Sequence, residues 1–359
     1  MAGEMVGEMG LQDEALSVPR AGAGELHRFC RQCLERAGME EEAAAIVASV
    51  LVKTSLRGVD THGVALLPGY VRSLREGRVA ARPDMQLLVG GPCTAVLDAG
   101  GGLGVLAAYR AMEAAIDMAR RSGLALVGVR NSSHFGAAAY YASMAVQHDM
   151  IGLAGSNGPP LMAPYGGRKA AMHNMPFAAA IPAGEEPPVV MDFAMSVAAF
   201  RKIRQAAQQG RPIPPGWALD REGRPTTDPA AAVQGGVLLP FGHKGYALGI
   251  LVDVLAGVLS GAGFGDRIPA DSGRNTGHFT MAIHVGFFMP VAQFKARMDQ
   301  LIRQLRATPP APGEEEVTVP GHRSFRILQE RSRDGIPLPG WIRTRLLETA
   351  AELQVPAPF

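Results

Sequence analysis

Hydrophobic positions in the first part of the chain recur at helical spacing. Apolar residues follow a 3.6-residue period from Glu25 to Leu56, and Gly38 interrupts the pattern. The acidic residues that follow Gly38 suit the N-terminus of a second helix. The pattern therefore predicts two helices over 25–56. A turn at 57–63 and a short helix over 66–76 come next.

Further along the chain, short apolar runs alternate with helical patterns. Strands are predicted at 95–97, 125–129, 151–154, 189–192 and 280–288. Helices are predicted at 105–122, 137–148, from 245 onward, 292–305 and 341–353. This alternation predicts an α/β fold with a sheet of mixed strand direction, clasped by helices from both ends of the chain.

The length of 359 residues is enough for two domains of average size. We expect a helical domain formed by 25–85 and 300–359, and an α/β domain over 86–299. Residues 1–24 are acidic and rich in glycine, without the basic and apolar regions of a signal peptide, so a flexible tail is expected. The one stretch that resembles a membrane span, 245–265, contains Asp253 and several glycines, which favours a buried core helix.

Composition narrows the class of protein. The 44 glycines and 27 prolines make up about 20% of the chain, against roughly 12% in an average protein, and they follow no repeat. This is typical of a ligand-binding α/β enzyme with many turns. The net charge of +2, without a basic stripe interleaved with aromatic residues, argues against nucleic acid as a partner. Three cysteines suit a reducing cytoplasm and not a disulfide framework.

Two local motifs resemble ligand sites that we do not expect to form. His27, Cys30 and Cys33 share one helical face, but zinc needs four ligands and no second cluster stands nearby, so no metal is expected. Residues 102–107 fit the G-x-G-x-x-A form of a dinucleotide fingerprint. Because the chain lacks the repeated βαβ units of a Rossmann sheet, a glycine-rich turn before a helix is the competing interpretation.

Reactive residue types gather in four clusters, each at the end of a predicted strand or helix. The clusters are Asp60–Gly63, Asn131–Gly136, Asp192–Ser196 and Gly242–Tyr246. Loops at the ends of regular elements commonly carry function. Because imidazole titrates near neutral pH, His62 and His134 are the candidates for a general acid or base.

At these residues the sequence resembles the malate/L-lactate dehydrogenase family. This family is distinct from the Rossmann enzymes and includes ureidoglycolate and sulfolactate dehydrogenases, 2,3-diketogulonate reductase and cyclic ketimine (Δ1-piperideine-2-carboxylate) reductases. The resemblance runs from about Glu25 to Gly335, and it rests on RGVDTHGVALLPGYV, NSSHFGAAAYYA, APYGG, MDFAMS, IPPGWALDREGRPTTDP and LPFGHKGYALGILVDVLAG. It implies a non-Rossmann NAD(P)-binding fold, hydride transfer between NAD(P)H and a small C=O or C=N substrate, and a homodimer.

The resemblance also implies roles for individual residues. The catalytic residues it implies are Thr61, His62, His134 and Asp192, of which Thr61, His62 and Asp192 match a Ser-His-Asp relay. The cofactor-binding residues it implies are Ser133, His134, Asn157, Asp192, Ala194, Ser196, His243, Lys244 and Gly245. The substrate-pocket residues are Leu66, Tyr70, Met172, His173 and Asn174. The same resemblance makes 102–107 a structural turn.

Several pocket positions depart from the family's pattern. Leu66 stands where many dehydrogenases of the family have an arginine that grips the substrate carboxylate. The usual Gly-Thr-Asn-Pro turn is replaced by Met172–Pro176, and Met172 and Met175 would add adaptable apolar surface there. We therefore expect a substrate that is larger or less acidic than malate or lactate. Two alternatives stay open: a cyclic imine reductase, and a non-redox enzyme or binding protein on the same scaffold.

Overall fold

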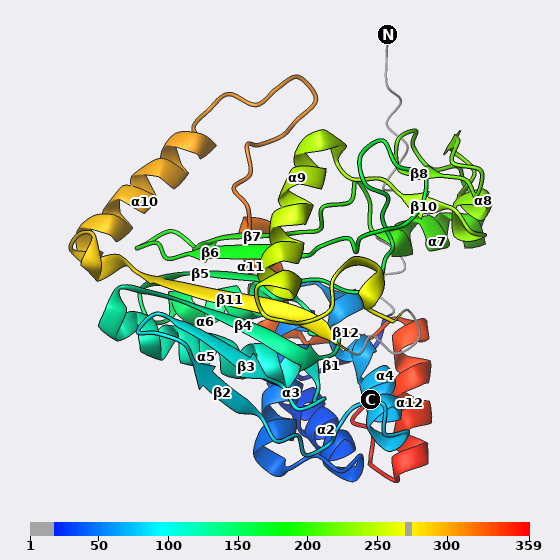
Figure 1. Cartoon of the computed structure of the whole chain (residues 1–359), viewed down its shortest axis with the longest axis horizontal. Coiled ribbons are helices and arrows are strands. Elements are labelled where there is room, and N and C mark those ends of the chain that lie inside the picture. The colour runs from blue at the N-terminus through cyan, green and yellow to red at the C-terminus, as the bar shows by residue number, and fades with distance from the viewer. Residues whose placement is uncertain (1–17, 270–274) are drawn as a thin grey trace. The chain divides into compact units, whose positions relative to one another are not determined.

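The chain folds into two compact units. A computed structural model describes residues 18–269 and 275–359, and Figure 1 shows their helices and strands. One unit runs up to Glu76 and resumes over 324–359, and the other comprises 77–323. The unit boundaries therefore lie at 76/77 and 323/324, whereas the sequence analysis placed them at 85/86 and 299/300.

Two segments that were assigned to the helical domain belong to the larger unit. The segment around Ala80 runs beside a glycine turn, because the Ala80 amide donates to the Gly101 carbonyl at 2.8 Å. The end of helix α10 (Val291–Arg306), beyond the predicted boundary at 299/300, is tied to the same unit, because Arg303 Nε donates to the Glu186 carboxylate at 3.0 Å. The apolar pattern marks a helix but does not say against which surface it packs.

The smaller unit is helical. Its helices are α2 (Ala23–Arg36), α3 (Glu41–Leu56), η1 (Asp60–His62), η2 (Val64–Leu66), α4 (Leu67–Arg75), most of α11 (His322–Asp334), and α12 (Gly340–Leu353). The predictions of two helices over 25–56 and of a C-terminal helix are confirmed. Strand β1 (Arg20–Ala21) pairs with β12 (Ile336–Pro337). The expected tail over 1–24 is therefore too long, and its first part, 1–17, lies outside the described residues.

The larger unit is built on a seven-stranded sheet in the order β2-β3-β4-β11-β5-β6-β7. The strands are β2 (Gln86–Val89), β3 (Thr94–Asp98), β4 (Leu124–Ser132), β5 (Met150–Ser156), β6 (Phe177–Ile181), β7 (Val189–Phe193) and β11 (Thr276–His284). Within this sheet β3 and β4 pair in parallel, and all other neighbours are antiparallel. The predicted mixed α/β sheet is confirmed, and it differs from the parallel sheet of a Rossmann fold.

Helices cover both faces of this sheet. In Figure 1, α5 (Gly104–Ser122) and α6 (Ala138–Val146) lie on one face. Helix α9 (Gly242–Asp253) continues into the π-helix η3 (Val254–Val258) on the opposite face. The core beneath α9 is rich in methionine, a side chain that adapts to irregular gaps. Its methionines, all at or below 5% exposed, are Met162, Met172, Met175 and Met195.

The stretch 212–240 contains a small sheet in the order β10-β8-β9. Its elements and neighbours are α7 (Phe200–Gln209), β8 (Ala218–Leu219), β9 (Pro225–Thr226), α8 (Pro229–Val233) and β10 (Val237–Leu238). The late strand predicted at 280–288 begins earlier, at Thr276. It ends at His284, because a 3-10 helix, η5 (Val285–Phe287), follows; another, η4 (Gly265–Arg267), precedes β11.

The apolar helix predicted over 245–265 is not buried on all sides. Val252 packs in the core at 2% exposed, but Leu251 and Leu259 on the outer face are 53% and 58% exposed. The prediction of a buried core helix is therefore wrong for this outer face, because apolar character all round does not show which face is covered. Among the helices of the described residues, none is long and apolar enough to cross a membrane.

Candidate functional site

The strand directions bring two of the predicted clusters, and the predicted cofactor residue Asn157, to one edge of the sheet. Strands β4, β5 and β7 run in the same direction, because β11 and β6 lie between them as antiparallel neighbours. Their carboxyl ends carry Ser132, Ser156 and Asp192. Four strand spacings, about 19 Å at the ordinary separation, lie between β4 and β7 along this edge. Asp192 is exposed there.

The turn at 131–136 presents His134 at this edge. Asn131 adopts a φ of +54°, a left-handed conformation that asparagine tolerates better than most residues. Its side-chain amide donates to the Asp98 carboxylate at 3.0 Å, at the end of the neighbouring strand β3. The His134 side chain is exposed. An imidazole on a turn fixed in this way is suited to proton transfer.

The glycine run at 102–107 supports the same turn. A Cβ on Gly104, the first residue of α5, would lie 2.0 Å from the Ser133 carbonyl oxygen and 2.8 Å from the His134 carbonyl carbon. The Gly104 amide donates to Ser133 Oγ at 3.1 Å, and that hydroxyl donates to the Gly102 carbonyl at 3.3 Å. The G-x-G-x-x-A pattern therefore has a packing reason, which agrees with its interpretation as a structural turn.

A buried histidine that the sequence analysis did not single out lies behind this turn. His278 is 0% exposed, and its Nε2 and Nδ1 atoms each lie 2.8 Å from a hydroxyl, those of Ser132 and Ser156. Burial and, less strongly, the nearby His134 lower the pKa of His278 to about 3, so its ring is neutral at physiological pH. His278 lies just before the strand predicted at 280–288, and no local motif in the sequence marks it.

Backbone hydrogen bonds place two further segments beside the Asp192–Ser196 cluster. The Met195 amide donates to the Asn174 carbonyl at 2.7 Å, and the Phe241 amide donates to the Met195 carbonyl at 3.0 Å. These bonds place the segments before β6, after β7 and at the start of α9 side by side. The first turn of α9 exposes His243 and Lys244, and its N-cap residue makes no side-chain capping bond. The other predicted residues here are Ala194, half-buried, and Gly245, buried.

Some residues predicted to bind the cofactor use their side chains within the chain. Ser196 Oγ donates to the carbonyl two residues further on at 2.9 Å. Asn157 is 3% exposed; its Oδ1 accepts from the Gly277 amide and its Nδ2 donates to Asp253, each at 2.8 Å. Ser133 is engaged with the start of α5, as described above. The side chains of these residues therefore position backbone segments.

The predicted substrate residues at 172–174 are largely internal. Met172 and Met175, which were expected to add apolar surface to the pocket, fill the core instead at 5% and 0% exposed. His173 Nδ1 lies 2.7 Å from the Pro159 carbonyl oxygen, and burial lowers the pKa of this histidine. Asn174 Oδ1 is buried and has no hydrogen-bond partner among the described residues, so it is an acceptor suited to a ligand N–H.

In the smaller unit, Thr61 and His62 form a hydrogen-bonded pair on η1. Thr61 Oγ1 lies 2.7 Å from His62 Nδ1, and the histidine ring is half-buried. Leu66, which ends η2, is also half-buried. Tyr70 in α4 is 7% exposed, and burial raises its pKa. A hydroxyl bonded to one imidazole nitrogen fixes the orientation of the ring, as a proton-transfer role requires.

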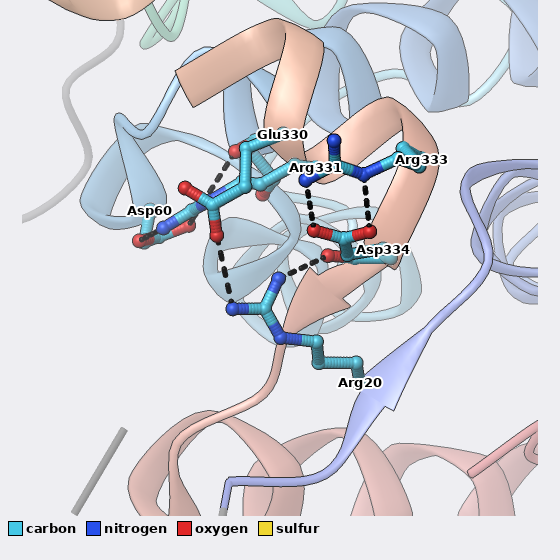
Figure 2. Close-up of polar contacts among 8 residues, drawn as sticks. Arg20, Asp60, Glu330, Arg331, Arg333 and Asp334 are labelled. Atoms are coloured by element: carbon cyan, nitrogen blue, oxygen red, sulfur yellow. Dashed lines mark hydrogen bonds and ion pairs between the residues drawn. The ribbon is translucent and has the colours of Figure 1, made fainter. Parts of the chain in front are cut away.

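An arginine from far along the chain anchors this turn. Arg331 on α11 donates to both carboxylate oxygens of Asp60, at 2.6 and 3.0 Å, and to the Ser55 carbonyl at 2.6 Å (Figure 2). The side chains of the pair are 13% and 24% exposed, so the bidentate contact is shielded from water. Sequence reasoning missed Arg331 because 271 residues separate it from Asp60.

The described residues contain no group of three or more His, Cys, Asp or Glu side chains that could hold a metal ion. The His27 ring instead lies 2.9 Å from Ser49 Oγ, on the neighbouring helix α3. Cys30 and Cys33 are buried, and burial raises the pKa of Cys33 to about 12. This helix face serves packing between α2 and α3.

Comparisons with known proteins agree with this architecture. Residues 22–346 match the malate/L-lactate dehydrogenase family. The malate dehydrogenase of Pyrococcus horikoshii is 36% identical over 359 residues, which cover 97% of this chain and 99% of that protein. The L-sulfolactate dehydrogenase of Methanothermobacter thermautotrophicus is 37% identical over 332 residues, which cover 91% of this chain and 95% of that protein.

Solved structures show the same similarity. The structure of the Pyrococcus horikoshii malate dehydrogenase matches with a TM-score of 0.87 at 35% identity, over 95% of this chain and 97% of that one. The Δ1-piperideine-2-carboxylate reductase of Pseudomonas syringae matches with a TM-score of 0.85 at 29% identity, over 92% of this chain and 100% of that one. The similarity therefore extends over both units.

Proposed function

The chain belongs to the malate/L-lactate dehydrogenase family and is an NAD(P)-dependent oxidoreductase, and on this premise we propose that it interconverts a small 2-oxo compound and its 2-hydroxy form. When bound, the nicotinamide supplies the hydride for the carbonyl carbon, so the chain itself must supply the proton for the carbonyl oxygen. The observation that carries the proposal is the exposed His134 on a turn fixed at the edge of the sheet.

His134 is the first candidate for the acid/base. Its protonated ring would donate to the carbonyl oxygen during reduction, and its neutral ring would accept the hydroxyl proton during oxidation. His62 is the second candidate. The hydrogen bond between Thr61 and His62 supports two members of the relay that the resemblance implies, and Asp192 stays a proposed third member.

The start of α9 and Asn174 suit a nicotinamide dinucleotide. Uncapped backbone N–H groups at a helix N-terminus favour a phosphate, and exposed Lys244 adds a positive charge there. The buried Asn174 Oδ1 atom, which lacks a protein donor, suits an amide N–H. We propose that these groups hold NAD or NADP, with His243 and Asp192 as further exposed contacts. Ser133, Asn157 and Ser196 would then act by positioning the backbone.

The substrate is proposed to differ from malate or lactate. Leu66 cannot pair with a carboxylate, whereas an arginine makes two charge-assisted hydrogen bonds to one. A cyclic imine reductase is the second candidate. The similarity to the Pseudomonas syringae reductase favours it, since a C=N carbon accepts hydride and its nitrogen accepts a proton in the same way.

We also propose that the protein is a cytoplasmic homodimer. All three cysteines are free, as in proteins of a reducing compartment. Exposed aliphatic side chains at helical spacing form one face of α9 and η3, and apolar faces of this kind commonly pack against a second subunit. This α9 face consists of Leu248, Leu251, Val254, Val258 and Leu259.

Binding of the reduced cofactors tests the proposal most directly. NADH or NADPH should gain fluorescence on addition of the protein and raise its melting temperature. A panel of 2-oxo acids, neutral ketones and cyclic imines should then identify the substrate through NAD(P)H consumption. A protein that binds neither cofactor in either assay would leave the non-redox alternative standing and overturn the reductase proposal.

A further inference from the structure

The ring of His278 lies outside the residues that the proposed reaction uses, yet it contacts both flanks of His134. We propose that His278 is a positioning residue, which through Ser132 and Phe135 sets the orientation of the His134 imidazole. The inference rests on the proposed function only in taking His134 as the acid/base. It concerns a fully buried group and calls for no proton transfer by His278 itself.

Each ring nitrogen of His278 has a serine hydroxyl as its neighbour. Ser156 Oγ lies 2.8 Å from Nδ1 and donates to the Asn157 and Gly277 carbonyls as alternatives, at 2.8 and 3.1 Å. Ser132 Oγ lies 2.8 Å from Nε2. A hydroxyl can donate to a ring nitrogen or accept from a ring N–H, so either tautomer of the neutral ring keeps both contacts. One of these contacts joins the ring to the strand that carries His134.

The position of His278 in the sheet explains how one ring bridges two strands. It lies on β11, which pairs with β4 on one side and β5 on the other. The register of β11 against β4 shifts between Thr276 and His278, as at a β-bulge, and a bulge re-aims the side chains beside it. His278 is therefore connected to Ser156, at the end of β5, and to Ser132, at the end of β4.

Residues on both sides of His134 in the sequence contact the His278 ring. Ser132, two residues before His134, has its hydroxyl 2.8 Å from Nε2. Phe135, the residue after His134, stacks on the His278 ring with centroids 4.7 Å apart and an interplanar angle of 10°. Phe135 also stacks on Tyr141, with centroids 5.3 Å apart. Loss of the ring would release the hydrogen bond and the stacking contact together.

Substitution of His278 by glutamine or asparagine tests the contacts of the two ring nitrogens separately. Glutamine reaches the place of Nε2 and asparagine the place of Nδ1, so His278→Gln keeps the bond to Ser132 and His278→Asn keeps the bond to Ser156. Both substitutions remove the stacking ring equally. If positioning runs through Ser132, kcat should be closer to the natural value in His278→Gln than in His278→Asn. A merely structural role predicts equal losses.

Serine variants provide the matched comparison. Ser132→Ala removes the link to the His134 turn and leaves the His278 ring in place. Ser260→Ala is the control, because Ser260 is also buried, at 2% exposed, and its hydroxyl donates to the Ala256 carbonyl away from His134. We expect Ser132→Ala to lower kcat by about tenfold or more, with the KM for NAD(P)H within about twofold, because small misplacements of a reacting group reduce the rate of chemistry. Ser260→Ala should keep both constants.

NMR of protein labelled at histidine Cε1 gives a readout that does not need turnover. The His134 signal, assigned by its loss in His134→Gln, should shift or broaden in Ser132→Ala and His278→Asn and stay in place in Ser260→Ala. An unchanged His134 signal and unchanged kcat in Ser132→Ala would overturn the proposal, even if His278→Asn fails to fold. If the natural protein binds no NAD(P)H, the proposed function fails, and the NMR comparison still decides the positioning role.

Discussion

At the scale of single residues, position on a turn distinguishes the two histidines suited to chemistry from three that link segments of the fold. His27, His173 and His278 each bond to serine or carbonyl groups inside one unit. His134 is instead exposed on a fixed turn. His62 is half-buried with one nitrogen bonded to an adjacent threonine, which is the arrangement of an oriented acid/base.

The first prediction concerns the Thr61–His62 pair. Thr61→Ala should lower kcat by about fivefold, the equivalent of ~1 kcal/mol for a typical hydrogen bond, because the His62 ring loses its orienting hydroxyl. Thr61→Ser keeps the hydroxyl and should retain nearly full activity. Steady-state kinetics of the two variants makes the comparison, and full activity in Thr61→Ala would exclude the pair from the mechanism.

The second prediction concerns Leu66. Leu66→Arg should raise kcat/KM for malate or lactate by about tenfold or more, because a charge-assisted bond to a carboxylate contributes about 1.5–3 kcal/mol. Leu66→Met, which adds no charge, is the control and should leave this ratio unchanged. If the natural protein already turns over malate or lactate efficiently, the expectation of an atypical substrate is wrong.

Some of these residues could be predicted from the sequence, and others could not. His62 and His134 could be predicted because glycines and polar residues surround them locally. His278 could not be ranked from the sequence, because its role depends on Ser132, which is 146 residues away. Arg331 depends in the same way on Asp60, at a separation of 271 residues. A local sequence motif indicates residues that are close in the chain. It gives no information about hydrogen bonds between residues that are far apart in the sequence.

At the scale of elements, the contact between α11 and η1 fixes the His62 turn. Arg331→Met would leave the Asp60 carboxylate partly buried without its cation, so the free energy of unfolding should fall by about 2 kcal/mol. Urea denaturation measures this loss. The matched control is Arg333→Met. The pair of Arg333 with Asp334, shown in Figure 2, is exposed and should contribute little to the free energy of unfolding. Equal stability of the two variants would contradict the anchoring role of Arg331.

The approach of α5 to the His134 turn gives a fourth prediction. Gly104→Ala would place a Cβ 2.0 Å from the Ser133 carbonyl oxygen, so the turn must shift and both stability and kcat should fall. Gly69→Ala is the control, because nothing lies within 4 Å of a Cβ there in α4. It should be neutral or stabilising by about 0.5–1 kcal/mol. Parallel thermal unfolding and activity assays would refute the packing argument if Gly104→Ala behaved like Gly69→Ala.

The elements that sequence reasoning missed differ in how much signal they carry. Phe200, Ile203 and Ala206 of α7 follow helical spacing and pack on the methionine-rich core, so this helix could have been predicted, whereas α11 has no buried residue. Strand β2 is exposed at all four positions, so it shows no alternation. Strand β6 is mostly alanine and gives little contrast between faces. Periodicity arises from burial against one surface, and β2 and β6 lack the contrast between faces that a pattern search needs.

At the scale of the whole molecule, the alternation of strands and helices was enough to predict the fold class. The unit boundaries could not be predicted in the same way, because their position depends on which surface α10 and the segment around Ala80 contact. The prediction that the apolar helix is buried failed for a related reason. Hydropathy identifies an apolar helix face, but it does not indicate whether the same chain or a second subunit packs against that face.

The α9 face therefore leads to the last prediction. Leu251 is 53% exposed near the middle of this face, and a lysine there would place a charge in any apolar contact with a second copy. Size-exclusion chromatography with light scattering should show a dimer for the natural protein and a shift toward monomer for Leu251→Lys. Leu301→Lys on α10, at a leucine 47% exposed, is the matched control and should stay dimeric. A natural protein that is monomeric at micromolar concentration would mean that the α9 face has another function, since its exposed leucines and valines would then remain in water.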